Sequence, residues 1–135
     1  MKAKELALFI ILDLAVIAFV LFLFFNIERQ TAGLIAGTIF FLQGLFILHK
    51  VRAWNNYTSS FTLYGALAHI FVATIPMVIL RVTHWSLSFE DIQLGLITGP
   101  GFHKFCEYIY LGLILCHIID LVRLKLVPKS KDKPI

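Results

Sequence analysis

Apolar residues dominate four long stretches of the chain, and short polar segments separate them. The stretches cover residues 6–25, 31–48, 61–80 and 103–126. Each is about 18–24 residues long, which at about 1.5 Å per residue gives helices of about 27–36 Å and matches a hydrocarbon core of about 30 Å. The alternating polarity of barrel strands is missing. The pattern therefore predicts an all-α integral membrane protein, a bundle of four transmembrane helices.

The composition agrees with this prediction. Of the 135 residues, 59% are hydrophobic and 15% are charged, whereas soluble domains have about 45–50% and about 25%. Four spans use most of the chain, so we expect one membrane domain over residues 1–135 and no separate catalytic domain. Cys106 and Cys116 lie ten residues apart on one predicted helix, about 15 Å, and cannot form a disulfide with each other. We do not expect an enzyme.

The basic residues predict an orientation. Of the 12 Lys and Arg residues, three (Arg29, Arg81 and Lys104) lie near the ends of the spans on one side of the membrane, and the remaining nine lie on the other. The positive-inside rule then places both termini, and the basic tail 127–135, in the cytoplasm. We expect a bacterial inner membrane protein whose partner is the lipid bilayer. A soluble basic face for nucleic acid is missing.

The longest connection joins the third and fourth spans. Ser88 and Asp91 have the spacing of a capping box, and apolar residues between Phe89 and Leu96 repeat with a helical period. The glycines and proline of residues 99–101 then end the pattern. We expect a short helix over about 88–98 that lies in the outer membrane interface.

Small residues form a seam along the second span. Gly33, Gly37 and Gly44 lie within about 40° of one another on a helix, at about 100° per residue. The spacing of Gly33 and Gly37 is the one that lets two helix backbones approach closely in lipid. We expect the seam to pack within the chain. Self-association, or binding to a larger membrane complex through Gly33 and Gly37, is the alternative.

Four ionisable residues interrupt the spans at a similar depth. Asp13, His69, His117 and Asp120 lie about 9–13 Å from the cytoplasmic ends of three different helices, at about 1.5 Å per residue. Such groups are costly in lipid and usually face the interior of a bundle. Because His117 and Asp120 are three residues apart on one helix, we expect this carboxylate to orient this imidazole.

Two cofactor hypotheses follow from this layer. His69 and His117, at one depth on antiparallel helices, are candidate axial ligands of a b-type haem in an electron-transfer subunit. Alternatively His69, His117, Asp120 and Asp13 together bind a divalent metal, because imidazole and carboxylate suit Zn or Fe. A tight ligand signature such as H-E-x-x-H is missing for either.

A third hypothesis is transport. Glu107, Tyr110 and Asp120 share one face of the fourth span and form a polar stripe that reaches toward the outer side, as a proton or ion relay requires. The remaining interpretation is structural, with the His/Asp layer fixing how the helices pack. It predicts a small, non-catalytic accessory or anchoring subunit, and it is the interpretation that the sequence favours.

Overall fold

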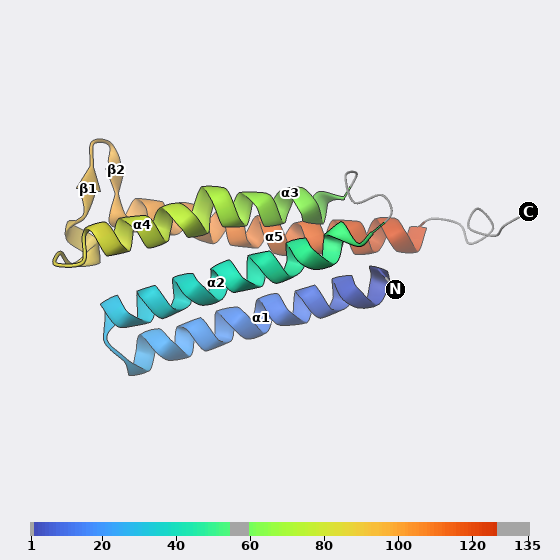
Figure 1. The fold of residues 1–135 in the computed structure, drawn as a ribbon, viewed down its shortest axis with the longest axis horizontal. Helices are drawn as coiled ribbons and strands as arrows, with labels where there is room; N and C mark the ends of the chain where they lie inside the picture. Colours follow the sequence, from blue (N-terminus) through green and yellow to red (C-terminus); the bar gives the residue numbers. More distant parts are fainter. Residues whose placement is uncertain (1, 55–59, 127–135) are drawn as a thin grey trace, which may run out of the picture.

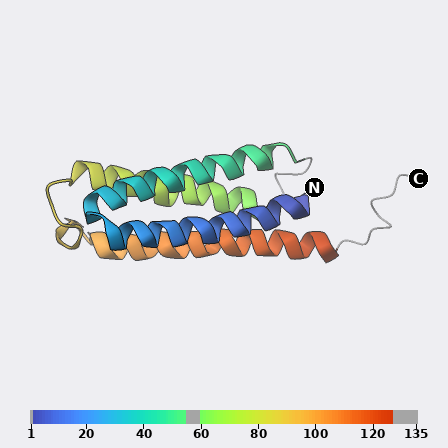
Figure 2. The same cartoon turned by 90° about the horizontal axis from the view of Figure 1, so that it is seen from below.

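The computed structural model describes residues 2–54 and 60–126, and these form four antiparallel helical rods (Figures 1 and 2). The elements in chain order are α1 (Lys2–Asn26), α2 (Arg29–Arg52), α3 (Phe61–Ala68), the π-helix η2 (His69–Thr74), α4 (Ile75–Thr83), the 3₁₀ turn η3 (Phe89–Asp91), β1 (Gln93–Leu94), β2 (Ile97–Thr98) and α5 (Gly99–Leu126). α1 packs against α2 and α5, and the third rod, made of α3, η2 and α4, packs against α2 and α5.

Within the described residues, four helices are long and apolar enough to cross a membrane, and they contain the four predicted spans. The fourth begins earlier than expected, at Gly99 and not near His103. The Thr98 hydroxyl oxygen accepts a hydrogen bond from the Gly101 N–H at 3.0 Å, which caps the start of this helix. Pro100 fits the first turn, where its missing N–H costs nothing.

The third rod changes its winding in the middle. Residues His69–Thr74 form a π-helix between two α-helical segments. Pro76 follows it, in the first turn of α4. A proline inside a helix has no N–H to donate and its ring crowds the carbonyl four residues earlier, and a wider turn relieves this crowding. His69 is therefore the first residue of an irregular turn at the centre of the bundle.

The predicted helix over 88–98 is wrong. Ser88 and Asp91 do bond to each other, because the Ser88 hydroxyl donates to Asp91 Oδ2 at 2.7 Å, but they close only the 3₁₀ turn η3. The next residues form an antiparallel hairpin of β1 and β2. Gly95 has φ +60°, a left-handed value that a continuing right-handed helix does not contain. Together with Leu96 it forms the two-residue turn between the strands.

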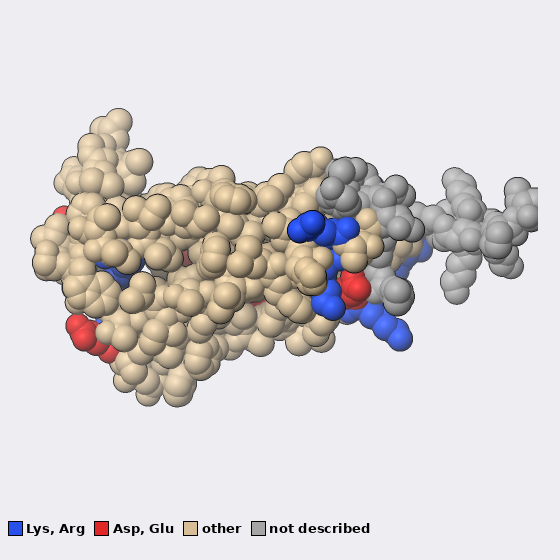
Figure 3. Space-filling model, in the orientation of Figure 1, with Lys and Arg blue, Asp and Glu red and all other residues tan. Residues whose placement is uncertain are grey.

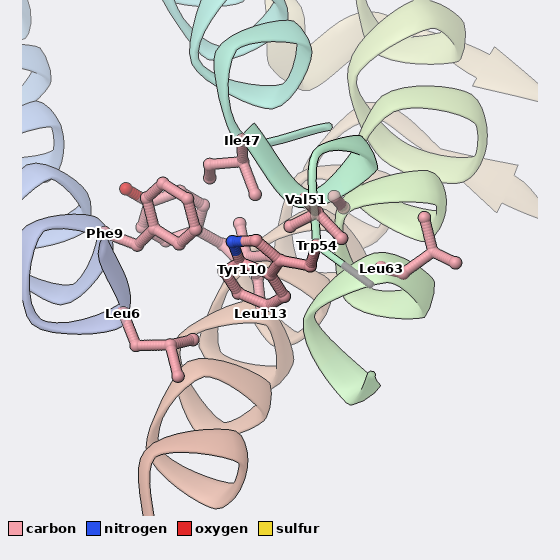
Figure 4. Close-up of a cluster of buried hydrophobic side chains, with 9 residues drawn as sticks. Leu6, Phe9, Ile47, Val51, Trp54, Leu63, Tyr110 and Leu113 are labelled. Carbon is pink, nitrogen blue, oxygen red and sulfur yellow. The ribbon is translucent and has the colours of Figure 1, made fainter. Parts of the chain in front are cut away.

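The main apolar core joins α1, α2, α3 and α5 (Figure 4). The Phe9 ring is fully buried and stacks on Trp54 with the ring centroids 6.3 Å apart. The Trp54 indole N–H donates to the Glu5 carboxylate. The buried residues of this core are Leu6, Phe9, Ile47, Val51, Trp54, Leu63, Ala66, Tyr110 and Leu113.

The glycine seam of α2 faces the third rod. A methyl group at Gly37 would lie 2.6 Å from Val78 Cγ2, and one at Gly44 would lie 2.5 Å from Ile70 Cγ1. At Gly33 a methyl group would lie 3.0 Å from the guanidinium of the buried Arg81. All three glycines therefore permit a close approach inside this chain.

Charged side chains gather at the two ends of the bundle, and the visible face between them is almost entirely without charge (Figure 3). The N-terminus of α1 and the C-terminus of α5 lie at the same end (Figure 1). The predicted basic tail 127–135 lies outside the described residues. A belt without charge between two charged ends is the surface that a bilayer requires.

Candidate functional site

The centre of the bundle holds a buried carboxylate and imidazole in direct contact. Asp13 of α1 and His117 of α5 are both 0% exposed, and Asp13 Oδ2 lies 2.5 Å from His117 Nδ1. The pair corrects the expectation that Asp120 orients His117. Residues 117 and 120 share a helix face, but the Asp120 carboxylate bonds to the start of α3 and His117 bonds to Asp13 of the neighbouring helix.

Two neutral side chains complete this contact. The Gln43 amide of α2 donates to Asp13 Oδ1 at 2.6 Å and to the Tyr110 hydroxyl at 3.1 Å. The Tyr110 hydroxyl of α5 donates in turn to the Asp13 backbone carbonyl at 2.6 Å. We call Asp13, Gln43, Tyr110 and His117 the central network. It joins α1, α2 and α5 by side-chain hydrogen bonds, which are strong in a low-dielectric interior.

His69 lies beside the central network without bonding to it. Its Nε2 lies 3.1 Å from the Phe40 carbonyl, and because a carbonyl only accepts, this nitrogen carries the proton. The rings of Phe40 and Tyr110 pack on the His69 ring, with centroids 5.7 and 5.4 Å away. His69 therefore ties the third rod to the backbone of α2.

Asp120 has different partners from the other three ionisable residues of the predicted layer. Its carboxylate accepts the N–H of Phe61 at 3.1 Å, the N–H of Thr62 at 2.7 Å and the Ser60 hydroxyl at 2.7 Å. These groups form the start of α3, whose first N–H groups lack partners within their own helix. Asp120 is thus an N-terminal cap that α5 supplies to α3.

The predicted relay residues do not form one chain. Tyr110 belongs to the central network and Asp120 caps α3, whereas Glu107 lies in the N-terminal part of α5. There its carboxylate pairs with His103 at 3.1 Å, and both side chains are about half exposed. Nearby, Arg29 of α2 pairs with Glu90 of η3. The side chains of both pairs are at least half exposed, so these are surface ion pairs.

The proposed metal ligands are not gathered. In the part of the chain that the structure describes, no group of three or more His, Cys, Asp or Glu side chains is placed to hold a metal ion. Asp13 faces His117, but both Asp120 oxygens are occupied by α3. The geometry therefore gives a metal hypothesis no support.

A haem between His69 and His117 does not fit the packing. The His117 side meets one requirement, since a carboxylate holds its Nδ1 and leaves Nε2 without a hydrogen-bond partner. The His69 side does not, because its Nε2 is bonded to Phe40 and the rings of Phe40 and Tyr110 cover it. A porphyrin would have to displace these rings.

Sequence reasoning did not identify Gln43 or the Ser60–Thr62 segment as parts of the site. Gln43 is the one polar side chain in the run Ile39–Leu48, and a lone amide in an apolar span is a detectable signal. Two of the hydrogen-bond donors to Asp120 are backbone N–H groups. No residue-type pattern reveals those, since every helix start offers them.

A groove of about 240 Å³ runs between α2 and α4, away from the central network. Its lining comprises Gly37, Thr38, Phe41, Thr74, Ile75, Val78 and Ile79. None of these side chains carries a charge. The lining includes no residue of the central network.

The fold and the site together define a class, a four-helix membrane-type bundle held by buried interhelical polar contacts. Comparisons with protein-family models, curated proteins and solved structures give no match for this chain. Any assignment of function therefore depends on the geometry of the chain itself.

Proposed function

We propose that the chain is a non-catalytic accessory or anchoring subunit of a membrane complex, and that its buried His/Asp network fixes the packing of its helices. The observation that carries the proposal is the distribution of the bonds of Asp13. Its side chain reaches Gln43 on α2 and His117 on α5, and its carbonyl accepts from Tyr110. Each of these contacts joins two helices and none points to a ligand.

The hydrophobic effect contributes little to helix association in lipid, so close packing and interhelical hydrogen bonds must stabilise the bundle. The central network joins three helices, Asp120 joins α5 to α3, and the glycine seam joins α2 to the third rod. This distribution supports a packing role for the ionisable residues. It leaves the exposed apolar surface for lipid and for a larger partner.

The cytoplasmic position of both termini, in a bacterial inner membrane, is part of the proposal. The start of α1 and the ends of α2 and α5 lie at one end of the bundle (Figure 1), and these helix ends carry Lys4, Lys50, Arg52, Arg123 and Lys125. The positive-inside rule favours the cytoplasm for this end.

A proton relay is the second candidate, and one observation favours it. His117 Nε2, Gln43 Oε1 and His69 Nδ1 are buried and have no hydrogen-bond partner. Buried polar atoms without partners are unusual and invite a water molecule or a mobile proton. Replacement of both Asp13 and His117 by apolar residues distinguishes the two roles. A packing role should tolerate this replacement, and a relay should not.

The test is purification of the tagged full-length chain in native lipid discs, with quantification of the membrane proteins that accompany it. We expect a partner at constant stoichiometry with the wild type. Asp13→Ala should lose the partner, because it leaves His117 buried without its carboxylate. Asp13→Ala/His117→Leu should keep it, because the pair is then apolar and packed.

Two outcomes would contradict the proposal. A wild-type chain that purifies without any stoichiometric partner would exclude the accessory role. If the doubly substituted chain retains its partner but fails to restore the growth of cells that lack the wild-type protein, the polar groups do more than pack helices. The relay would then be the better account.

A further inference from the structure

The hairpin of β1 and β2 stands out sideways from the end of the bundle opposite the termini (Figure 1). Its apolar side chains have no cover within the described chain. Leu96 at the turn is 103% exposed, and Leu94 and Ile97 are 47% and 54% exposed. Three large apolar side chains on one projecting hairpin form an unusual surface for a segment that water alone surrounds.

The hairpin is amphipathic. Gln93 pairs with Thr98, and Leu94 pairs with Ile97. Directly paired residues lie on the same face of a hairpin, and successive residues lie on opposite faces. One face therefore carries the polar pair and the other the apolar pair, with Leu96 at the tip.

The base of the hairpin is fixed to the bundle. Ile92 is 2% exposed and packs in a cluster with Leu80, Met77 and Phe102. The Gly99 N–H donates to the Ile92 carbonyl at 2.8 Å, which closes the base. The direction of the hairpin is thus set by buried contacts with α4 and α5.

The position of the hairpin matches a membrane boundary. It connects the end of α4 at Thr83 to the start of α5 at Gly99, where two candidate spans end. Its apolar side chains continue the exposed apolar surface of these spans, which includes Val82 and Phe105. No Asp, Glu, Lys or Arg occurs from residue 92 to residue 102.

The open backbone edges limit the depth that the hairpin can reach. A two-stranded hairpin has N–H and C=O groups along both outer edges, and these cannot be left without partners in hydrocarbon. Water and lipid headgroups satisfy them at the interface, where an amphipathic segment also buries its apolar face. An uncharged, amphipathic hairpin at this boundary is suited to lipid.

We propose that residues 92–99 are a lipid anchor that lies in the headgroup region of the outer leaflet, with Leu94, Leu96 and Ile97 against the acyl chains. The anchor requires the four helices to cross the bilayer, and it is independent of the role of the central network. It would fix the tilt and height of the third and fourth spans relative to the membrane surface.

The test uses spin labels on the full-length chain in lipid nanodiscs of phosphatidylcholine and phosphatidylglycerol. Cys106 and Cys116 are replaced by alanine, and single cysteines are placed at Leu96, at Gln93 on the polar face, and at Leu111, an exposed residue within the fourth span. Relaxation by oxygen, which concentrates in lipid, is compared with relaxation by a water-soluble nickel chelate at each label.

The label at Leu96 should show a severalfold higher oxygen-to-nickel ratio than the label at Gln93, and a lower ratio than the label at Leu111. Equal ratios at Leu96 and Gln93, with strong nickel relaxation, would overturn the proposal by placing the hairpin in water. Weak relaxation by both reagents at Leu96 would also overturn it, because protein would then cover the tip. A water-exposed label at Leu111 would instead contradict the membrane-spanning helices themselves.

Discussion

Asp13 and Asp120 are buried carboxylates of adjacent helices, and their surroundings give them different roles. Asp13 accepts from the Gln43 amide and lies against His117. Asp120 accepts from the backbone at the start of α3. A buried charge is tolerated when several donors surround it. Asp120 also accepts from Arg123 of its own helix at 3.4 Å. The shorter bonds of both residues join two elements, so each one stabilises a contact between helices.

Asp120→Ala should lower the free energy of unfolding by about 1–3 kcal/mol, because it leaves the N–H groups of Phe61 and Thr62 without their acceptor. Unfolding in mixed detergent micelles, followed by circular dichroism, measures the loss. Glu107→Ala is the control, since this half-exposed side chain makes only a surface pair and should change little. An Asp120→Ala chain as stable as the wild type would contradict the capping role.

At the scale of single residues, the sequence identifies the ionisable groups but not their partners. Asp13, His69, His117 and Asp120 stand out because lipid excludes charge. The pairing of Asp13 with His117 depends on which helices are neighbours, and periodicity along one helix contains no information about that. The similar depths predicted for Asp13 and His117 agree with their direct contact. Depth did not separate Asp120, which lies nearer the start of α3.

Helix pairs in this bundle are set by small residues as much as by polar ones. The seam on α2 lets the third rod approach until the side chains of Val78 and Ile70 occupy the space above Gly37 and Gly44. Close approach increases van der Waals contact, which is the principal attraction between helices in lipid. The seam and the central network therefore act on different neighbours of the same helix.

Gly44→Ala should lower the free energy of unfolding by about 1–3 kcal/mol, since its methyl group would lie 2.5 Å from Ile70 Cγ1 and 3.3 Å from His69 Cδ2. Gly112→Ala is the matched control, because a methyl group there meets nothing within 4 Å. That variant should be neutral or slightly stabilising. Equal effects of the two substitutions in the same micelle titration would show that the seam does not determine packing.

At the scale of elements, helix existence was predictable and the connection between the third and fourth spans was not. Long apolar stretches leave only one spanning form. Residues 88–98 have the helical spacing of apolar residues, yet Gly95 takes a positive φ and reverses the chain. In such a short segment, apolar residues three or four positions apart do not distinguish a helix from a turn followed by a hairpin.

For the whole molecule, the contacts close a ring of four rods. α1 lies between α2 and α5, and the third rod contacts α2 and α5 on the other side. The central network spans three of these rods, and Asp120 and the seam attach the third rod. The order of the rods follows from this set of contacts taken together. No single stretch of sequence contains it.

The most direct test of the packing role is a double-mutant cycle on Asp13 and His117. Free energies of unfolding are measured in mixed micelles for Asp13→Ala, for His117→Leu and for the double substitution. Removal of one partner of a buried pair costs about 3–5 kcal/mol, so each single change should be strongly destabilising. The double change should cost much less than the sum, with a coupling above the ~0.6 kcal/mol average for interhelical hydrogen bonds in membranes. Single changes without effect, or losses that simply add, would contradict a packing role for this pair.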